Sequence, residues 1–302
     1  MTELRGTWFV VPTAFDEAGD LDGAGQRRLV EAVVSWDVDG LTAMGVTGEA
    51  AALTPDERHR ALEAIFEGTA GRVPIVVGCS GGHARVAIDL AGRAAALGAA
   101  AVMVSAPPLH RDLESLPAFF AQVAEGVDVP VVIQDEPAAT GVRIPVGLLL
   151  ACLEAAGSRT VKLEDPPTPP KIARLLAADA GLRVFGGLGG ASALGELRRG
   201  ACGTMTGFAF PEILRAVRQA VNAGEPGEAA RIFDRYLPLI QLEGQPGIGL
   251  AIRKELLRRR GALPSPTSRL ARPLAEDTIR DIDDTLGRLG IRPGPAPLAV
   301  DR

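Results

Sequence analysis

The sequence predicts a parallel (β/α)8 barrel, a TIM barrel, with a C-terminal helical extension. Short apolar runs alternate with longer segments of helical periodicity, and the apolar runs recur about every 30 residues, as in such barrels. These runs are continuously apolar and do not alternate with polar residues, which is typical of parallel strands that are covered on both faces. A chain of 302 residues has the length for one such barrel and an extension.

Eight segments have the composition of buried strands. In chain order they are residues 8–11, 40–44, 74–78, 101–105, 129–133, 159–165, 183–186 and 203–206. Helical segments follow the first seven strands, at residues 22–36, from 54 onward, 84–97, 116–125, 146–156, 171–180 and around 194–197. The second helix has the clearest start, because Thr54 can cap it and Pro55 suits its first position.

The pattern changes after the eighth strand. Residues 212–222, 228–242, 248–260 and 276–289 are predicted as helices with no strand between them. We therefore divide the chain into a barrel of residues 1–210 and a helical extension of residues 211–302 that packs on the barrel, so that the two form a single structural unit. The last dozen residues are rich in proline and glycine and are predicted to form a loose tail.

Composition narrows the class of protein. The net charge is −5 and the charged residues are interspersed, which argues against nucleic-acid and membrane partners. The three cysteines have no CxxC spacing and the three histidines are isolated, so we expect a reducing compartment and no metal site. The first residues lack the apolar run of a signal peptide, and we expect a cytoplasmic protein.

Lysine is scarce, and one lysine has an unusual setting. Lys162 lies between Val161 and Leu163 near the carboxyl end of the sixth strand, where active sites of these barrels lie. Desolvation favours the neutral amine, which can attack a carbonyl and form a Schiff base. The alternative is a lysine that reaches out of the strand into a structural ion pair. Lys171 and Lys254 lie in charge-rich helical segments and are predicted to be solvated.

Two further segments are expected to line the mouth of the barrel. After the second strand, the small residues around Val46 and Thr47 let backbone N–H groups and a hydroxyl approach a ligand carboxylate. The alternative is a tight turn in which Glu49 caps a helix. After the seventh strand, the glycine run that begins at Gly186 is expected to form a pocket wall, and a phosphate site there is less expected.

Candidates for substrate contact and proton transfer lie at other strand ends. Gln134 ends the fifth strand, and Met205 lies in the eighth. Glu164 follows Lys162 by two positions, so the two side chains should share one face of the strand, and Glu164 is the first candidate for proton transfer. His110, in the loop after the fourth strand, is the second. Further candidates are Asp135, Glu136, the Thr47 hydroxyl and a water held by Gln134.

Several short motifs follow one another in a specific order along nearly the whole chain. They are Pro12-Thr13-Ala14-Phe15, Gly45-Val46-Thr47-Gly48-Glu49, Val73-Pro74-Ile75-Val76-Val77-Gly78, Thr140-Gly141, Lys162, and Glu243 with Pro246 and Lys254. In this order they resemble the dihydrodipicolinate synthase / N-acetylneuraminate lyase family of class I aldolase-type lyases. The resemblance implies a barrel, usually a homotetramer, in which Lys162 forms a Schiff base with pyruvate or another 2-oxo acid. It also implies that Thr47 and adjacent amides hold the substrate carboxylate. We expect no cofactor.

The sequence departs from the family pattern at several positions that the family uses for proton transfer and substrate binding. Gln134 stands where the family has a proton-relaying tyrosine, and Pro108-Leu109 replaces a tyrosine pair. Val46 replaces the first threonine of the usual Gly-Thr-Thr-Gly-Glu motif, and Ala139 replaces an arginine of the lysine-pathway enzymes. We therefore expect an atypical member that does not act as the lysine-pathway dihydrodipicolinate synthase.

Three functions remain open at this point. The first is a Schiff-base lyase or aldolase that cleaves a carbon–carbon or carbon–oxygen bond of a 2-oxo acid. The second is an imine-dependent dehydratase or deaminase of a 2-oxo sugar acid or hydroxy acid. The third is a catalytically lapsed member that binds a 2-oxo acid without turnover.

Overall fold

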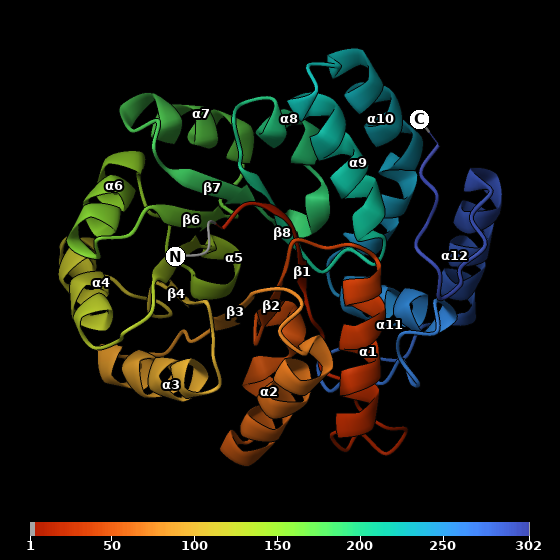
Figure 1. Cartoon of the computed structure of the whole chain (residues 1–302), viewed down its shortest axis with the longest axis horizontal. Helices are drawn as coiled ribbons and strands as arrows, with labels where there is room; N and C mark the ends of the chain where they lie inside the picture. The colour runs from red at the N-terminus through yellow and green to blue at the C-terminus, as the bar shows by residue number, and fades with distance from the viewer. Residues whose placement is uncertain (1–3, 302) are drawn as a thin grey trace.

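The structure is a computed structural model that describes residues 4–301, and its centre is a closed barrel of eight parallel strands in chain order (Figure 1). The strands are β1 (Gly6–Val10), β2 (Gly40–Ala43), β3 (Ile75–Gly78), β4 (Ala101–Ser105), β5 (Val131–Asp135), β6 (Thr160–Leu163), β7 (Arg183–Gly186) and β8 (Gly203–Thr206). The predicted TIM barrel with a C-terminal helical extension is confirmed.

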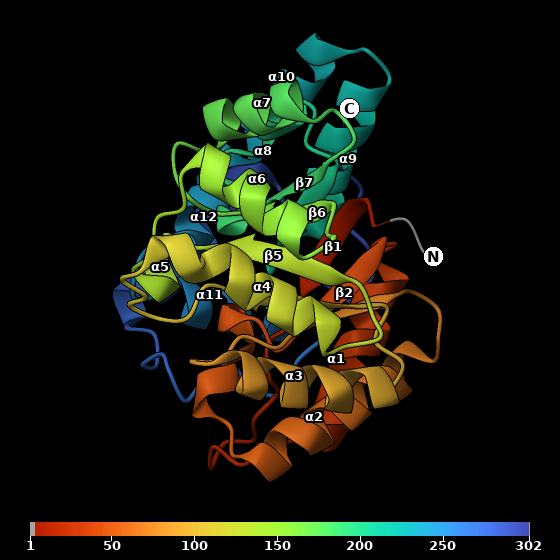
Figure 2. The ribbon, with the colours of Figure 1, turned by 90° about the vertical axis from the view of Figure 1, so that its left-hand side faces the viewer.

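Helices surround the strands on all sides in Figure 1. They are α1 (Gly23–Ser35), α2 (Pro55–Thr69), α3 (Ala84–Ala96), α4 (Leu116–Glu125), α6 (Val146–Ala155), α7 (Thr168–Ala178), α8 (Ala193–Leu197) and α9 (Pro211–Asn222). The strand-to-helix loops carry short helices: η1 (Val46–Gly48), η2 (Ala50–Ala52), η3 (Leu113–Ser115), α5 (Pro137–Thr140) and η4 (Leu188–Gly190). In the side view of Figure 2, α5 lies beyond the carboxyl end of β5.

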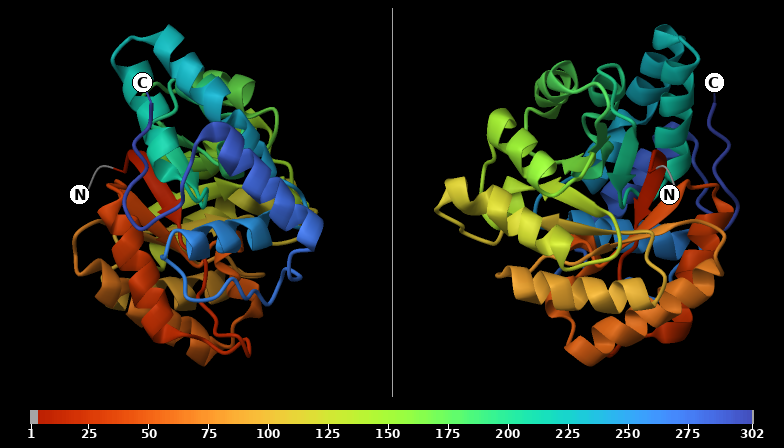
Figure 3. Two further views of the ribbon diagram at one scale, coloured as in Figure 1. Left: turned by 90° about the vertical axis from the view of Figure 1, so that its right-hand side faces the viewer. Right: turned by 60° about the vertical axis from the view of Figure 1, so that its left-hand side comes forward.

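The extension continues with α10 (Pro226–Glu243), α11 (Gly249–Arg259) and α12 (Glu276–Leu289). Figures 1 and 3 show α11 and α12 together on one side of the barrel. Within residues 4–301, no strand follows β8. In the same part of the chain, no helix is both long and apolar enough to cross a membrane.

Alternation of side chains along the strands separates two apolar clusters. Trp8, Met103, Val132, Phe185 and Met205 belong to a cluster inside the barrel, where the Trp8 and Phe185 rings meet edge to face at 6.1 Å. The intervening strand residues belong to the larger cluster between strands and helices. Burying each large apolar side chain contributes about 1.5–3 kcal/mol. The same alternation decides which polar side chains at the strand ends point into the barrel.

The predicted start of α2 is confirmed in detail. Thr54 caps the helix by accepting a hydrogen bond from the Glu57 backbone, and the Glu57 side chain accepts one from the Thr54 N–H at 2.9 Å. Pro55 occupies the first turn, where a missing N–H costs nothing. Arg269, which comes from the extension, forms two hydrogen bonds with Glu57 and thereby holds its pKa at about 2.

Two lysines predicted to be solvated are buried, and that prediction is wrong. Helix α7 begins three residues earlier than predicted, so Lys171 lies in its first turn, where it pairs with Asp135 at 2.5 Å and Asp165 at 2.9 Å. Lys254 is fully buried and pairs with Glu49. Each lysine can be buried because an ion pair with a buried carboxylate distant in sequence offsets the free-energy cost of removing the ammonium charge from water.

The prediction of a loose C-terminal tail is also wrong. The Trp36 indole N–H donates to the Pro295 carbonyl at 2.9 Å, and the Leu298 N–H donates to Glu212 at 2.8 Å. The side chains of Leu298 and Val300 pack against the core. Hydrogen bonds to groups far upstream therefore hold a segment whose own composition indicates disorder.

Candidate active site

Lys162 points into the barrel near the carboxyl end of β6. It is in register with Phe185 on β7, which belongs to the interior cluster. Its Nζ lies 3.0 Å from Oε2 of Glu164, and both side chains are nearly inaccessible to solvent. The prediction that Glu164 shares the facing of Lys162 is confirmed. The pair combines an amine with a carboxyl group close enough to exchange a proton with whatever the amine binds.

Gln134 joins this pair to a second carboxyl group. On β5 it is in register with Lys162, and its Nε2 donates to Glu164 Oε2 at 2.8 Å and to Glu136 Oε2 at 2.9 Å. The other oxygen of Glu164 accepts a hydrogen bond from the Leu188 N–H at 3.2 Å. These bonds fix both carboxyl groups on the β5–β7 side of the interior, with Glu136 one strand away from the lysine.

Glu136 can both give and take a proton near neutral pH. Burial and the negative charge of Glu164 together raise the pKa of Glu136 to about 7, against the opposing effect of the Lys162 charge. A carboxyl group whose pKa lies near the working pH is suited to general acid–base catalysis. Asp135, the other acidic candidate on β5, points away from the interior and pairs with Lys171 instead. The structure therefore separates two adjacent acidic residues that the sequence alone leaves equivalent.

The loop after β2 lies across the barrel mouth, because β2 and β6 stand opposite each other in an eight-strand ring. The Thr47 hydroxyl oxygen is buried and has no hydrogen-bond partner in the described part of the chain. Val46 beside it is 56% exposed. An unpaired buried hydroxyl costs free energy that a ligand carboxylate could recover. The predicted role of Thr47 and Val46 in carboxylate binding remains a prediction.

Glu49 anchors this loop: it is the N-cap residue of the short helix η2, but its side chain makes no capping hydrogen bond. Its backbone is left-handed, with φ 54°, and its side chain forms the buried pair with Lys254. The same carboxylate accepts hydrogen bonds from the Ser268 hydroxyl at 2.7 Å and the Arg269 N–H at 2.8 Å. The C-terminal extension therefore holds the loop that carries Thr47.

Hydroxyl groups occupy the β2–β4 side of the interior. Ser105 follows the interior residue Met103 by two positions, and its hydroxyl donates to the Ser80 hydroxyl at 3.0 Å. Thr42 on β2 faces inward by the same alternation, and its hydroxyl has no partner among residues 4–301. Sequence reasoning did not select these three residues, because an isolated serine or threonine at a strand end has no distinctive pattern. The lumen thus has a neutral hydroxyl side and a charged side.

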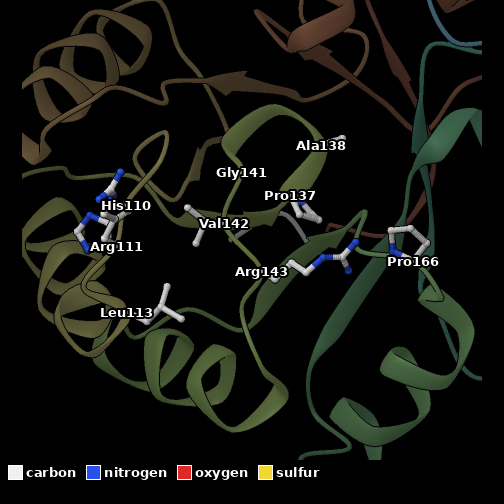
Figure 4. Close-up of a pocket in the computed structure, with 9 residues that line it drawn as sticks. All are labelled: His110, Arg111, Leu113, Pro137, Ala138, Gly141, Val142, Arg143 and Pro166. Carbon is white, nitrogen blue, oxygen red and sulfur yellow. The ribbon is translucent and has the colours of Figure 1, made fainter.

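His110 lies elsewhere. It lines a cleft of about 530 Å³ between the loops that follow β4, β5 and β6, together with Arg111, Arg143 and Pro166 (Figure 4). Its Nε2 is 2.8 Å from the Ser115 hydroxyl. In the described part of the chain, no hydrogen bond or ion pair joins His110 to Lys162. The structure therefore does not bring the second proton-transfer candidate to the lysine.

The remaining predicted residues are deeply buried. Met205 is fully buried in the interior cluster, and substrate contact there remains a prediction. Gly186 faces outward against Glu196, whereas Gly187 faces Glu164. Within residues 4–301, no three histidine, cysteine or acidic side chains are arranged so that they could hold a metal ion.

Known proteins resemble this chain over nearly its whole length. It is 34% identical to the L-2-keto-3-deoxyarabonate dehydratase of Azospirillum brasilense over 287 residues, which are 92% of either chain. It is 30% identical to a 4-hydroxy-tetrahydrodipicolinate synthase of Acidobacterium capsulatum over 295 residues, 95% of either chain. The crystal structure of a dihydrodipicolinate synthase from Rhodopseudomonas palustris matches with a TM-score of 0.89 and 32% identity, covering 94% of this chain and 97% of that one.

A family model supports the same grouping. The model of the dihydrodipicolinate synthetase family matches residues 3–283, which include the barrel, Lys162 and most of the helical extension. By this match and by the relatives, the chain belongs to the dihydrodipicolinate synthetase family, whose members are lyases of the aldolase type.

Proposed function

We propose that the protein is a dehydratase that binds a 2-oxo acid as an imine on Lys162 and eliminates water from it. The observation that carries the proposal is the 3.0 Å approach of Lys162 Nζ to Glu164 Oε2. The amine bonds to C2 of the substrate, so a carboxylate beside the amine lies near C3. An imine at C2 acidifies the C3 proton, and this proton must leave in a dehydration.

The proposed sequence of steps uses two carboxyl groups. Lys162 adds to the 2-oxo group and loses water to give the imine. Glu164 takes one proton from C3, and the resulting enamine expels a hydroxyl group from C4, which leaves as water with a proton from Glu136. The hydrogen bonds that Gln134 donates to both carboxyl groups hold them for this transfer. Hydrolysis of the imine then releases the dehydrated 2-oxo acid and the free lysine, and proton exchange with water returns Glu164 to its ionised form and Glu136 to its neutral form.

The rest of the interior favours a polyhydroxylated substrate. The unpaired Thr47 hydroxyl is available to the substrate carboxylate. The hydroxyl side formed by Thr42, Ser80 and Ser105 can bind substrate hydroxyl groups, and it carries no charge. We therefore expect a 2-oxo-3-deoxy sugar acid with a neutral distal half. The 34% identity to a 2-keto-3-deoxyarabonate dehydratase supports this class of substrate.

Aldol cleavage is the second candidate function. It is favoured by similarity to synthases that include a relative at 30% identity. It requires a base at the C4 hydroxyl, where the family resemblance places a tyrosine and this chain has Gln134. An amide cannot transfer a proton, so in aldol cleavage Glu136 would have to act as the base at the C4 hydroxyl, whereas dehydration uses the Glu164 carboxyl group beside C3.

The first experiment traps the imine. Borohydride in the presence of pyruvate should add one pyruvyl unit to the peptide that contains Lys162, and Lys162→Arg should abolish the adduct, because a guanidinium is permanently charged. Mass spectrometry locates the adduct. Attachment to Lys171 or Lys254, or no adduct with any 2-oxo acid, would contradict the proposal.

The second experiment distinguishes dehydration from aldol cleavage. Each 2-oxo-3-deoxy pentonic or hexonic acid is incubated with the enzyme, and products are followed by mass spectrometry and by a lactate dehydrogenase assay for pyruvate. Dehydration gives a product that keeps every carbon and has lost one water, whereas aldol cleavage releases pyruvate. A trapped imine without either product across the panel would indicate a member that binds 2-oxo acids without turnover.

A further inference from the structure

Glu196, on α8, is a buried carboxyl group that the proposed mechanism does not use. It is fully buried, and its Oε1 accepts a hydrogen bond from the Thr168 hydroxyl at 2.5 Å. Its Oε2 has no hydrogen-bond partner, and no lysine or arginine forms an ion pair with it, in the part of the chain that the structure describes. A buried carboxyl group without a cation is costly, so its position requires an explanation.

Two glycines separate Glu196 from Glu164. A Cβ atom on Gly186 would lie 1.8 Å from Glu196 Oε2, and a Cβ atom on Gly187 would lie 2.3 Å from Glu164 Oε1. Successive residues face opposite sides of a strand, so the carboxyl groups approach the end of β7 from its outer and inner faces. We call Gly186 and Gly187 the glycine wall. Any larger residue at either position would displace one of the two carboxyl groups.

The charge of Glu196 changes near neutral pH. Burial, with a smaller contribution from the negative charge of Glu164, raises the pKa of Glu196 to about 7, against the opposing effect of the Thr168 hydrogen bond. The groups that face Glu196 are thus Thr168 from α7, Gly186 from β7 and, across the glycine wall, Glu164. Electrostatic coupling between two sites is reciprocal, so a charge on Glu196 acts on Glu164 as well.

We propose that Glu196 is a positioning residue that strengthens Glu164 as a proton acceptor through the glycine wall. The inference rests on the proposed role of Glu164 at Lys162. Repulsion between the two carboxylates is relieved when Glu164 takes the C3 proton, so an anionic Glu196 stabilises the proton-transfer step relative to the ground state. The other charged groups that face Glu164 are Lys162 and Glu136, and neither lies behind the wall.

The kinetic test compares the wild type with Glu196→Gln across pH. Glutamine has nearly the same shape and keeps an oxygen for the Thr168 hydroxyl. At pH 5.5 both side chains are neutral, and kcat/KM should agree. Above pH 7 only the wild type carries the charge, and the variant should fall behind by about tenfold, the effect of roughly one pK unit. The exposed Glu154→Gln serves as the control and should follow the wild type throughout. If kcat/KM of Glu196→Gln is lower than that of the wild type by the same factor at every pH, the role of Glu196 is merely structural and the proposal is overturned.

An infrared titration tests the coupling without turnover. The carbonyl stretch of the neutral Glu196 carboxyl group is assigned as the band that Glu196→Gln removes. In the wild type it should disappear with a midpoint near pH 7, and in Glu164→Gln the midpoint should move to lower pH, because the negative neighbour is absent. An unchanged midpoint in Glu164→Gln overturns the proposal. If the wild type traps no imine, the proposed function fails, and this titration still decides whether the two carboxyl groups are coupled.

Discussion

Lys162 Nζ and Glu164 Oε2 lie 3.0 Å apart inside the barrel, on two inward-facing positions at the end of one strand. Glu164 also accepts hydrogen bonds from Gln134 and from the Leu188 N–H, so its carboxyl group has little freedom to leave the lysine. In the proposed mechanism this arrangement fixes the proton acceptor beside the bond that Lys162 would form, and it uses no tyrosine at the end of the fifth strand.

Glu164→Gln should separate imine formation from turnover. Glutamine has a single amide oxygen, so it keeps only one of the two accepted hydrogen bonds, and it cannot take a proton. Trapping with pyruvate should persist while kcat falls at least about 100-fold, the low end of the general acid–base range. Single-turnover and steady-state assays on the same substrate measure the two effects. His110→Asn is the comparison, and it should stay close to the wild type because no hydrogen bond or ion pair joins His110 to Lys162 in the described part of the chain. If kcat instead stays unchanged in Glu164→Gln and falls in His110→Asn, the proton transfer belongs to His110.

Gly187→Ala should disturb the site through Glu164. The added methyl group would lie 2.3 Å from Glu164 Oε1, far inside van der Waals contact, so the carboxyl group must move. We expect pyruvate trapping to persist and kcat to fall about tenfold or more, since a displacement of about 1 Å is costly in catalysis. Gly147→Ala is the matched control, because a Cβ atom there meets no heavy atom within 4 Å. Equal activity of the two variants would mean that Glu164 does not need its observed position.

The barrel, the lysine and its carboxyl partner could be predicted because each follows from local pattern. Strand periodicity gives the facing of residues two apart, which was enough to place Glu164 beside Lys162. The buried state of Lys171 and Lys254 could not be predicted, because it depends on Asp135 and Glu49, which are distant in sequence. The tail was misjudged for a similar reason, since Glu212 and Trp36 hold it from far upstream.

The serine side chains of the site also could not be predicted, because their contact depends on how distant segments pack. Ser80 and Ser105 meet only because β3 and β4 are neighbours with a particular register, and no feature of either residue marks it in the sequence. In the sequence, Glu196 is only one residue of the helical segment predicted around residues 194–197. Its relation to Glu164 depends on the two glycines between them, whose small size becomes informative only once both faces of β7 are known.

Assembly is a separate prediction. The family resemblance implies a homotetramer, and two large apolar side chains in the mouth loops, Val46 at 56% and Leu109 at 76%, are exposed in the single chain. Association would remove such surface from water. Sedimentation velocity at micromolar concentration should give the mass of four chains. A stable monomer under these conditions would contradict the expectation.

Lys254→Met should strongly destabilise the fold. The substitution leaves Glu49 buried without its cation, and breaking a fully buried pair in this way costs about 3–5 kcal/mol. The free energy of unfolding from urea titration measures the loss. Arg93→Met, which breaks an exposed pair with Asp89, is the control and should cost about 0–1 kcal/mol. If both variants lose the same amount, the extension does not anchor the Thr47 loop through this pair.

The last prediction concerns the stability of Glu196→Gln at two pH values. The pKa of Glu196 is raised from 4.5 to about 7 in the folded state, so between these values the folded chain binds more protons than the unfolded chain. The free energy of unfolding contributed by this group is therefore full below pH 4.5 and is lost as pH rises toward 7. Glutamine does not titrate, so the variant should gain stability relative to the wild type between pH 5 and pH 8, by an amount on the order of 1–3 kcal/mol.

Urea unfolding of both proteins at pH 5 and pH 8 measures this change, and every group common to the two proteins cancels in the comparison. The exposed Glu154→Gln should show no such gain with pH. If the stability difference between Glu196→Gln and the wild type is the same at both pH values, Glu196 is ionised throughout the range in the folded chain. Its charge would then be constant across neutral pH, and the proposed divergence in kcat/KM could not arise from its titration.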